Sequence, residues 1–255
     1  TSTTKGTLTT ISRTKYHRFG PYKFENANKG IYVALKGTTL GFFDNDLDAK
    51  EYADSTSHYY GNIEGDHYTS DNQRPWHGVR TTVKKAQIFD KIQPTSTENW
   101  FVSMSNMTTI TSLTNLDTSK VTSMKDMFAD CNSLTSVSVS HFDTSNVTNM
   151  MGMFARCSSL TSIDVSDFNT SKVTTMNAMF QGCSKITSLD LRNWSTSRVR
   201  DFTWLFRDCT NLSNIQGISN LNTSSVTALT ATFANSPKLT SLNLSSWSTS
   251  RVTDM

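Results

Sequence analysis

Apolar and polar residues recur with a fixed period along the second half of the chain. Three units begin at Asp117, Asp143 and Asn169 and are spaced by 26 residues: DTSKVTSMKDMFADCNSLTSVSVSHF, DTSNVTNMMGMFARCSSLTSIDVSDF and NTSKVTTMNAMFQGCSKITSLDLRNW. A fourth unit of 27 residues (195–221), a fifth (222–247) and the start of a sixth (248–255) follow. A period of this length predicts a repeat protein whose units stack on one another, because one unit cannot bury its own apolar face.

Within one unit the apolar spacing predicts two kinds of local structure. In the second unit, Leu160-x-x-Ile163-x-Val165 has the spacing of a leucine-rich-repeat strand, with polar residues between the apolar ones. An apolar set that steps by three and four residues predicts a short helical turn: Met150, Met153, Phe154 and Cys157. The Asp/Asn/Ser-Thr-Ser triplet that opens each unit predicts a turn, because these side chains bond to nearby backbone groups.

A less regular unit precedes these copies and aligns with the fourth. The matched apolar pairs are Phe101 with Phe206, Met104 with Cys209, Met107 with Leu212, Ile110 with Ile215, Leu113 with Ile218, and Leu116 with Leu221. The repeat array is therefore expected over residues 99–255, cut within a sixth full-type unit, with further repeats and a cap or anchor beyond it. An open coil at that end would favour end-to-end self-association.

The four cysteines, Cys131, Cys157, Cys183 and Cys209, are also spaced by 26 residues. This regularity makes them a feature of the repeat rather than a disulfide framework or a zinc site. Ser236 replaces the cysteine in the fifth unit. We therefore expect buried, reduced thiols that pack as small apolar side chains, with a disulfide between neighbouring coils as the alternative.

These motifs resemble the BspA-like leucine-rich-repeat surface proteins of bacteria, whose units are close to MFxxCxxLTSLDLSxFDTSxVTxM. The matching segments are Met153-Phe154-x-x-Cys157, Leu160-Thr161-Ser162-Ile163-Asp164-Val165 and Asp143-Thr144-Ser145-x-Val147-Thr148-x-Met150. The resemblance implies a leucine-rich-repeat-type solenoid, with parallel β strands and short helical turns in each coil. It also implies a secreted or surface-attached bacterial protein that adheres to host tissue, matrix protein or neighbouring cells, with no defined ligand.

The resemblance extends more weakly upstream, to Gly37-Thr38-Thr39-Leu40, Pro75-Trp76 and a Pro-Thr-Ser-Thr-x-x-Trp-Phe entry at 94–101. It implies a small β-rich N-terminal capping module over residues 29–98, with 79–92 as the strand that closes the first coil. A solenoid needs such a cap over its apolar end. Residues 1–28 are Thr-rich and polar and are expected to be a flexible lead.

Stacking converts variable repeat positions into rows of side chains. The residue before the repeat valine is Lys120, Asn146, Lys172, Arg198, Ser225 and Arg251, so four of six are basic. Such a row is either a binding site for an anionic partner, such as a sialylated or sulfated glycan, a teichoic acid or an acidic protein patch, or a solvated face that only maintains solubility. Polar positions on the strand, among them Asp164 and Asp190, form a second candidate row.

Two features of the cap are weaker candidates. His58-Tyr59-Tyr60 and His67-Tyr68 have the residue types of a carbohydrate platform, although ordinary packing and loop chemistry explain them better. Asp44-Asn45-Asp46-Leu47-Asp48 resembles the start of a calcium loop, but Ala49 and Ser55 stand where the loop needs Gly and Glu. No metal and no cofactor are predicted.

Composition narrows the functional classes. The net charge of +3 is too small for nucleic-acid binding, and no apolar run is long enough to span a bilayer or to form a signal-peptide core. The five histidines have no metal-ligand spacing, and no nucleophile elbow or phosphate-binding loop is present. The sequence therefore predicts a surface binding module for a host extracellular protein, a glycan or another cell-surface polymer. The alternative is a stalk that projects another domain.

Overall fold

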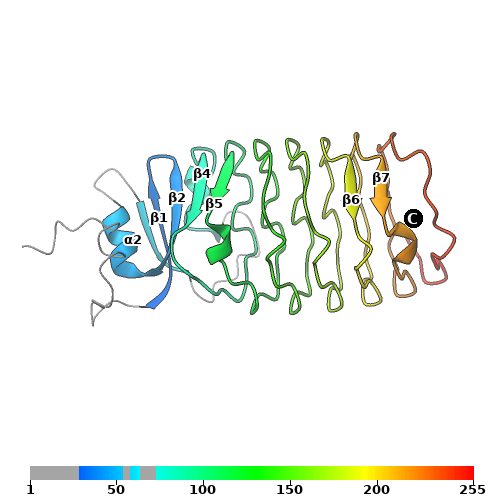
Figure 1. Ribbon diagram of the computed structural model, residues 1–255, viewed down its shortest axis with the longest axis horizontal. Coiled ribbons are helices and arrows are strands. Elements are labelled where there is room, and N and C mark those ends of the chain that lie inside the picture. The colour runs from blue at the N-terminus through cyan, green and yellow to red at the C-terminus, as the bar shows by residue number, and fades with distance from the viewer. Residues whose placement is uncertain (1–28, 54–57, 64–72) are drawn as a thin grey trace, which may run out of the picture.

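The structure is a computed structural model that describes residues 29–53, 58–63 and 73–255; the expected flexible lead, 1–28, lies outside them. The molecule is elongated, with a sheet and a helix at its N-terminal end and a row of coils that continues to the C-terminus (Figure 1). The elements are, in chain order, β1 (Lys29–Lys36), β2 (Thr39–Asn45), α2 (Asp46–Tyr52), β3 (His58–Asn62), η3 (His77–Val79), β4 (Lys85–Ile88), β5 (Thr109–Thr111), η4 (Leu113–Asn115), β6 (Ser188–Asp190), β7 (Asn214–Gln216) and η5 (Ile218–Asn220).

The sheet at the N-terminal end has the order β3-β1-β2-β4-β5. Strand β1 is antiparallel to β2 and β3, whereas β4 pairs in parallel with both β2 and β5. Side chains alternate across it: Ile31 and Val33 join the long core of the coils, while Tyr32 and Ala34 pack on the other face with Ala49 of α2. The sheet thus continues from an antiparallel hairpin directly into the parallel coils.

Strand β4 covers only part of the strand that was expected over residues 79–92. The chain first passes through η3 and a turn in which the Thr82 N–H donates to the Val79 carbonyl, so pairing begins at Lys85. Beyond β4, Ile92 forms an isolated parallel bridge to Leu116.

Parallel pairing at one residue per unit joins the coils. Successive bridges connect Ser96, Ser123, Asn149, Thr175, Asp201, Ala228 and Asp254. Because the bridges are parallel and recur at the same repeat position, equivalent residues form rows along the long axis of the molecule. This pairing already includes Ser96, so coil-to-coil contacts begin before the expected boundary at residue 99.

The segment expected to form a helical turn instead carries the densest pairing between coils. In the second unit, alternate backbone N–H groups donate to carbonyls of the third unit; the donors are Met150, Gly152, Phe154 and Arg156. The N–H groups of Met153, Ala155 and Cys157 donate to carbonyls three residues earlier in the same unit. The predicted helical turn is wrong, because Gly152 and Arg156 have left-handed φ values of 59° and 57°, which interrupt a right-handed helix.

The leucine-rich-repeat strand forms in some units and not in others. Strands β6 and β7 lie at this position in the third and fourth units and pair in parallel. In the second unit, residues 160–165 form no regular strand, so the prediction is wrong there. The expected alternation of burial persists, with Leu160 and Val165 buried and Asp164 exposed.

The irregular unit that precedes Asp117 has the same local structure as the fourth unit, as their apolar alignment predicts. In the irregular unit, β5 is followed by η4; in the fourth, β7 is followed by η5. A left-handed residue separates strand and 3-10 helix in both, Ser112 (φ 55°) and Gly217 (φ 80°). Ile110 and Ile215 occupy the centres of the two strands.

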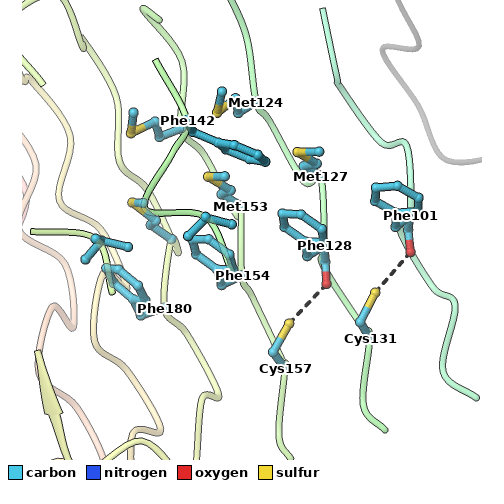
Figure 2. Packing of buried hydrophobic residues seen from close by; sticks show 14 of the residues in the cluster. Phe101, Met124, Met127, Phe128, Cys131, Phe142, Met153, Phe154, Cys157 and Phe180 are labelled. Atoms are coloured by element: carbon cyan, nitrogen blue, oxygen red, sulfur yellow. Dashed lines mark hydrogen bonds between the residues drawn. The ribbon is translucent and has the colours of Figure 1, made fainter. Parts of the chain in front are cut away.

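A stack of phenylalanine rings runs through the core (Figure 2). Its centroid separations are 5.5 to 5.9 Å, and its members are Phe101, Phe128, Phe154, Phe180, Phe206 and Phe233. The near-parallel rings, one from each unit, allow adjacent coils to approach closely while each ring is covered on both faces. At the N-terminal end, Trp100 and Phe42 of β2 continue this aromatic packing.

A second internal row consists of the threonine in each Asp/Asn/Ser-Thr-Ser triplet. These hydroxyls are buried and donate to backbone carbonyls of the next unit: Thr118, Thr144, Thr170, Thr196 and Thr223. The turn expected at the triplet is confirmed in the second unit, where the Ser145 N–H donates to Oδ1 of Asp143 at 2.9 Å. The triplet therefore makes the turn and also bonds one coil to its neighbour.

Two side chains from the capping region satisfy the backbone of the first coil. Within the array, the carbonyls of Met127 and Ala129 accept N–H groups from the preceding coil. Their equivalents one unit earlier are the carbonyls of Trp100 and Val102. The buried guanidinium of Arg74 donates to both, at 3.2 and 2.8 Å, and the Trp76 indole N–H donates to the Trp100 carbonyl at 3.0 Å. Side-chain donors thus replace a missing coil.

Candidate binding surface

The parallel register places the basic residues predicted to bind in one row. Each precedes a valine of the internal valine row, of which Val121, Val147, Val173, Val199 and Val226 are fully buried. Since a buried residue fixes the direction of its neighbour, the preceding side chains point to solvent. Lys120, Lys172, Arg198 and Arg251 are all exposed. We call the six positions 120, 146, 172, 198, 225 and 251 the basic row.

Contacts between neighbouring coils support this alignment. Lys172 Nζ donates to Oδ1 of Asn146 at 2.7 Å, and the Asn146 side-chain amide donates to the Ser119 carbonyl at 2.8 Å. At a strand spacing of about 4.8 Å, cations two coils apart, such as Lys120 and Lys172, are separated by roughly 10 Å. That separation is close to the screening length of about 8 Å at physiological salt, so an extended anion would interact with several of them at once.

The two aspartates of the second candidate row have local structural roles. Asp164 Oδ1 accepts hydrogen bonds from the backbone N–H and the hydroxyl of Ser166. Asp190 accepts from the Arg192 N–H and forms an ion pair with the Arg192 guanidinium at 2.7 Å. These hydrogen bonds from Arg192 lower the pKa of the Asp190 carboxyl. Both aspartates therefore stabilise turns, and their row is distinct from the basic row.

The cysteine row is confirmed as four free, buried thiols. Each Sγ–H donates to a phenylalanine carbonyl of the preceding coil, as from Cys157 to Phe128 at 3.1 Å (Figure 2). In the fifth unit the Ser236 hydroxyl makes the equivalent bond to Phe206 at 2.7 Å. The thiols therefore act as weak donors within the core, which explains why serine can replace one of them.

We expect these thiols to be unreactive in the folded protein. Burial raises the pKa of Cys157 from 9.0 to about 12 and that of Cys209 also to about 12, which suppresses the reactive thiolate. As the pH rises, the thiols ionise in the unfolded chain before they ionise in the folded protein. Their contribution to folding stability is therefore fully present below about pH 9 and is lost as the pH rises toward 12. Ellman's reagent at pH 8 should titrate no thiol in native protein and four in denaturant; rapid labelling of native protein would contradict the buried row.

The cap aromatics pack against one another. His58 stacks on Tyr60 at 6.1 Å, Tyr60 meets Trp76 edge-on, and Tyr59 stacks on Tyr32 at 6.4 Å. Packing holds these rings in place, but His58 and Tyr59 remain exposed, so the carbohydrate platform stays a prediction. His67 and Tyr68 lie outside the described residues.

A cluster of carboxylates includes part of the suspected calcium loop. Asp44, Asp48 and Asp90 have carboxylate oxygens within 4.8 Å of one another. Asp90, far along the chain, has no signal in the local sequence motif. The Asn45 amide donates to Asp44 and Asp48 at 2.8 and 3.0 Å, and the Asp48 N–H donates back to Asn45 at the start of α2. The helix cap thus accounts for much of this arrangement, and the absence of a metal stays a prediction.

Sequence reasoning missed the corner positions where each coil turns. Two left-handed residues recur in every unit, four positions apart, and at most of them the residue is not glycine. The first of these positions in the fourth unit is occupied by Trp204, which is exposed and lies beside Arg207. The only sequence signal was an aromatic residue where the other units have Asn, Asp, Gly or Ala.

Together, the rows define a repeat protein whose stacked coils present long polar surfaces to solvent. Residues 95–213 and 183–255 match the family described as "Mycoplasma protein of unknown function, DUF285", and the chain belongs to this family. A leucine-rich repeat protein from Eubacterium ventriosum is similar at 15% sequence identity, over 84% of this chain and 82% of that chain, with a TM-score of 0.30, which is too low to establish a common fold. No curated protein gives a significant match. In the described part of the chain, no helix has the length and apolar character required to cross a membrane.

Proposed function

We propose that the protein is the binding region of a bacterial cell-surface or secreted protein and has no enzymatic activity. Its stacked coils form a leucine-rich-repeat-type solenoid of the BspA-like kind. It recognises an anionic glycan or an acidic protein surface on host tissue or on a neighbouring cell. The observation that carries this proposal is the alignment of Lys120, Lys172, Arg198 and Arg251 on one exposed row.

The row suits an extended anion better than a small one. Its cations recur along the stack without a surrounding pocket, so each contact is solvent-exposed and weak by itself. Several weak contacts to one polymer act together, since binding the first group raises the effective concentration of the next. Binding should therefore be sensitive to salt and should increase with the length of the anionic chain.

Charge reversal at the centre of the row tests this proposal. We expect the double variant Lys172→Glu/Arg198→Glu to lose about tenfold or more in affinity for immobilised heparin and for anionic ligands on glycan and matrix-protein arrays. The matched control is Lys185→Glu/Lys238→Glu, which makes the same change in net charge at exposed positions outside the row. Retention chromatography on heparin at several salt concentrations provides the measurement.

The outcomes separate the alternatives. Equal losses in both variants would indicate a response to net charge and would contradict a specific row. A wild-type chain that binds nothing on these arrays would favour the stalk, in which the repeats only project another domain. Turnover of a generic glycoside, ester or peptide substrate that one substitution abolishes would contradict the absence of enzymatic activity.

A further inference from the structure

One corner of the coil presents an aromatic side chain where the fold does not require one. The equivalent left-handed positions have φ values between 51° and 59° and are occupied by Asn99, Asp126, Gly152, Ala178, Trp204 and Ala231. The Trp204 N–H donates to the Thr230 carbonyl of the next coil at 3.0 Å, so coil pairing fixes this backbone conformation. A left-handed conformation is unfavourable for a bulky residue, so the backbone at this corner does not favour tryptophan.

The indole of Trp204 also remains in contact with solvent. Its exposed fraction is 38%, whereas Trp76, Trp100 and Trp194 are buried. The corresponding positions of the two adjacent coils carry alanine, at Ala178 and Ala231, so the fold does not require a large side chain at this corner.

Arg207 holds the ring in a defined orientation. Its guanidinium carbon lies over the indole, 5.3 Å from the ring centroid, within the range of a cation–π contact. The Arg207 N–H donates to the Trp204 carbonyl at 3.1 Å, which closes the turn between them. The guanidinium Nε is 3.3 Å from Oδ2 of Asp208 but makes no aligned hydrogen bond. One face of the indole is therefore in contact with the guanidinium, and the tryptophan keeps 38% of its surface exposed.

We infer that Trp204 is a carbohydrate-binding platform, with Arg207 as its positioning residue. The electron-rich face of an indole attracts the C–H groups on the apolar face of a pyranose ring. A single ring among alanine and threonine offers the area of one sugar, whereas a protein hot spot needs a wide, well-packed surround. The platform is separate from the basic row and does not depend on it.

Tryptophan fluorescence and a glycan array test this inference with the whole chain. We expect binding to some glycans on an array of neutral and acidic oligosaccharides. Titration with cellohexaose, chitohexaose and sialyllactose as soluble probes should shift the emission of the exposed tryptophan for at least one probe. Trp204→Ala should reduce array binding about tenfold, and Trp204→Phe should retain part of it, since a smaller aromatic face remains.

The controls separate this site from folding and from the basic row. Trp204→Ala should have a thermal midpoint equal to or above that of the wild type, because alanine occupies the same corner in both adjacent coils. In the wild-type protein, the bound probe should protect the tryptophan from acrylamide quenching, a measurement that needs no variant. Lys172→Glu/Arg198→Glu should leave binding of the neutral probes intact. A wild-type chain that binds no glycan, or array binding that Trp204→Ala leaves unchanged, would overturn the inference.

Discussion

Replacing Gly217 with alanine is expected to destabilise the protein by about 2–5 kcal/mol, the sum of overpacking and a left-handed backbone penalty. An added Cβ would lie 2.6 Å from both Cα and N of Arg192 and 2.8 Å from the carbonyl carbon of Leu191. These are backbone atoms of the preceding coil, which no rotamer change can move away. The two coils would have to separate where β6 and β7 pair.

The matched control is Gly37→Ala, in the turn between β1 and β2. Gly37 also has a positive φ, of 57°, but nothing lies within 4 Å of an added Cβ. It should therefore lose only about 1–2 kcal/mol, the conformational part of the penalty. Urea unfolding followed by far-UV circular dichroism measures both variants, and equal losses would show that contact between the coils at Gly217 is unimportant.

Replacing Phe154 with alanine is expected to cost about 3–5 kcal/mol, the usual range for removal of a buried aromatic side chain. Phe154 is fully buried and stacks on Phe128 and Phe180 at 5.5 and 5.8 Å. The two remaining rings cannot close the gap, because the backbone bonds of the second unit hold the coils at a fixed separation. A cavity would therefore remain in the middle of the ring stack.

Two further variants distinguish a cavity from a general weakening of the unit. Phe154→Leu retains most of the volume and should cost less than Phe154→Ala. Ser162→Ala changes an exposed side chain of the same unit and should stay within about 0.5 kcal/mol of the wild type. Thermal and urea unfolding give the ranking, and a small effect of Phe154→Ala would contradict the continuous stack.

Much of the architecture follows from the period of the apolar residues. Four features can be read from the sequence: the 26-residue spacing, the inward positions of Leu160 and Val165, the cysteine row, and the equivalence of the fourth unit to the irregular unit before Asp117. Each depends on which side chains are buried, and burial is what an apolar pattern reports.

Local backbone conformation was less predictable. Met150, Met153 and Phe154 have helical spacing, yet their segment forms consecutive turns, because Gly152 and Arg156 adopt left-handed conformations. Arginine, alanine and tryptophan rarely do so, and here they do because N–H groups are bonded to the next coil. That constraint comes from stacking, which no single unit encodes in its own residues.

The candidate surface was predictable where it depended on register and unpredictable where it depended on contacts. Parallel stacking was enough to place Lys120, Lys172 and Arg198 in one row. The sequence alone did not show that Asp190 would pair with Arg192, two residues away, nor that Trp204 would be held by Arg207 at a corner of the coil.

The way in which Arg74 and Trp76 bond to the first coil has a consequence for association between molecules. An uncovered coil presents a row of carbonyl acceptors that can template a strand from another chain, the first step toward a fibril. Here the Trp100 and Val102 carbonyls already accept hydrogen bonds from buried side chains. A second molecule would have to displace a buried guanidinium before it could add at this face. This end of the stack is therefore protected against polymer growth by hydrogen bonding rather than by electrostatic repulsion.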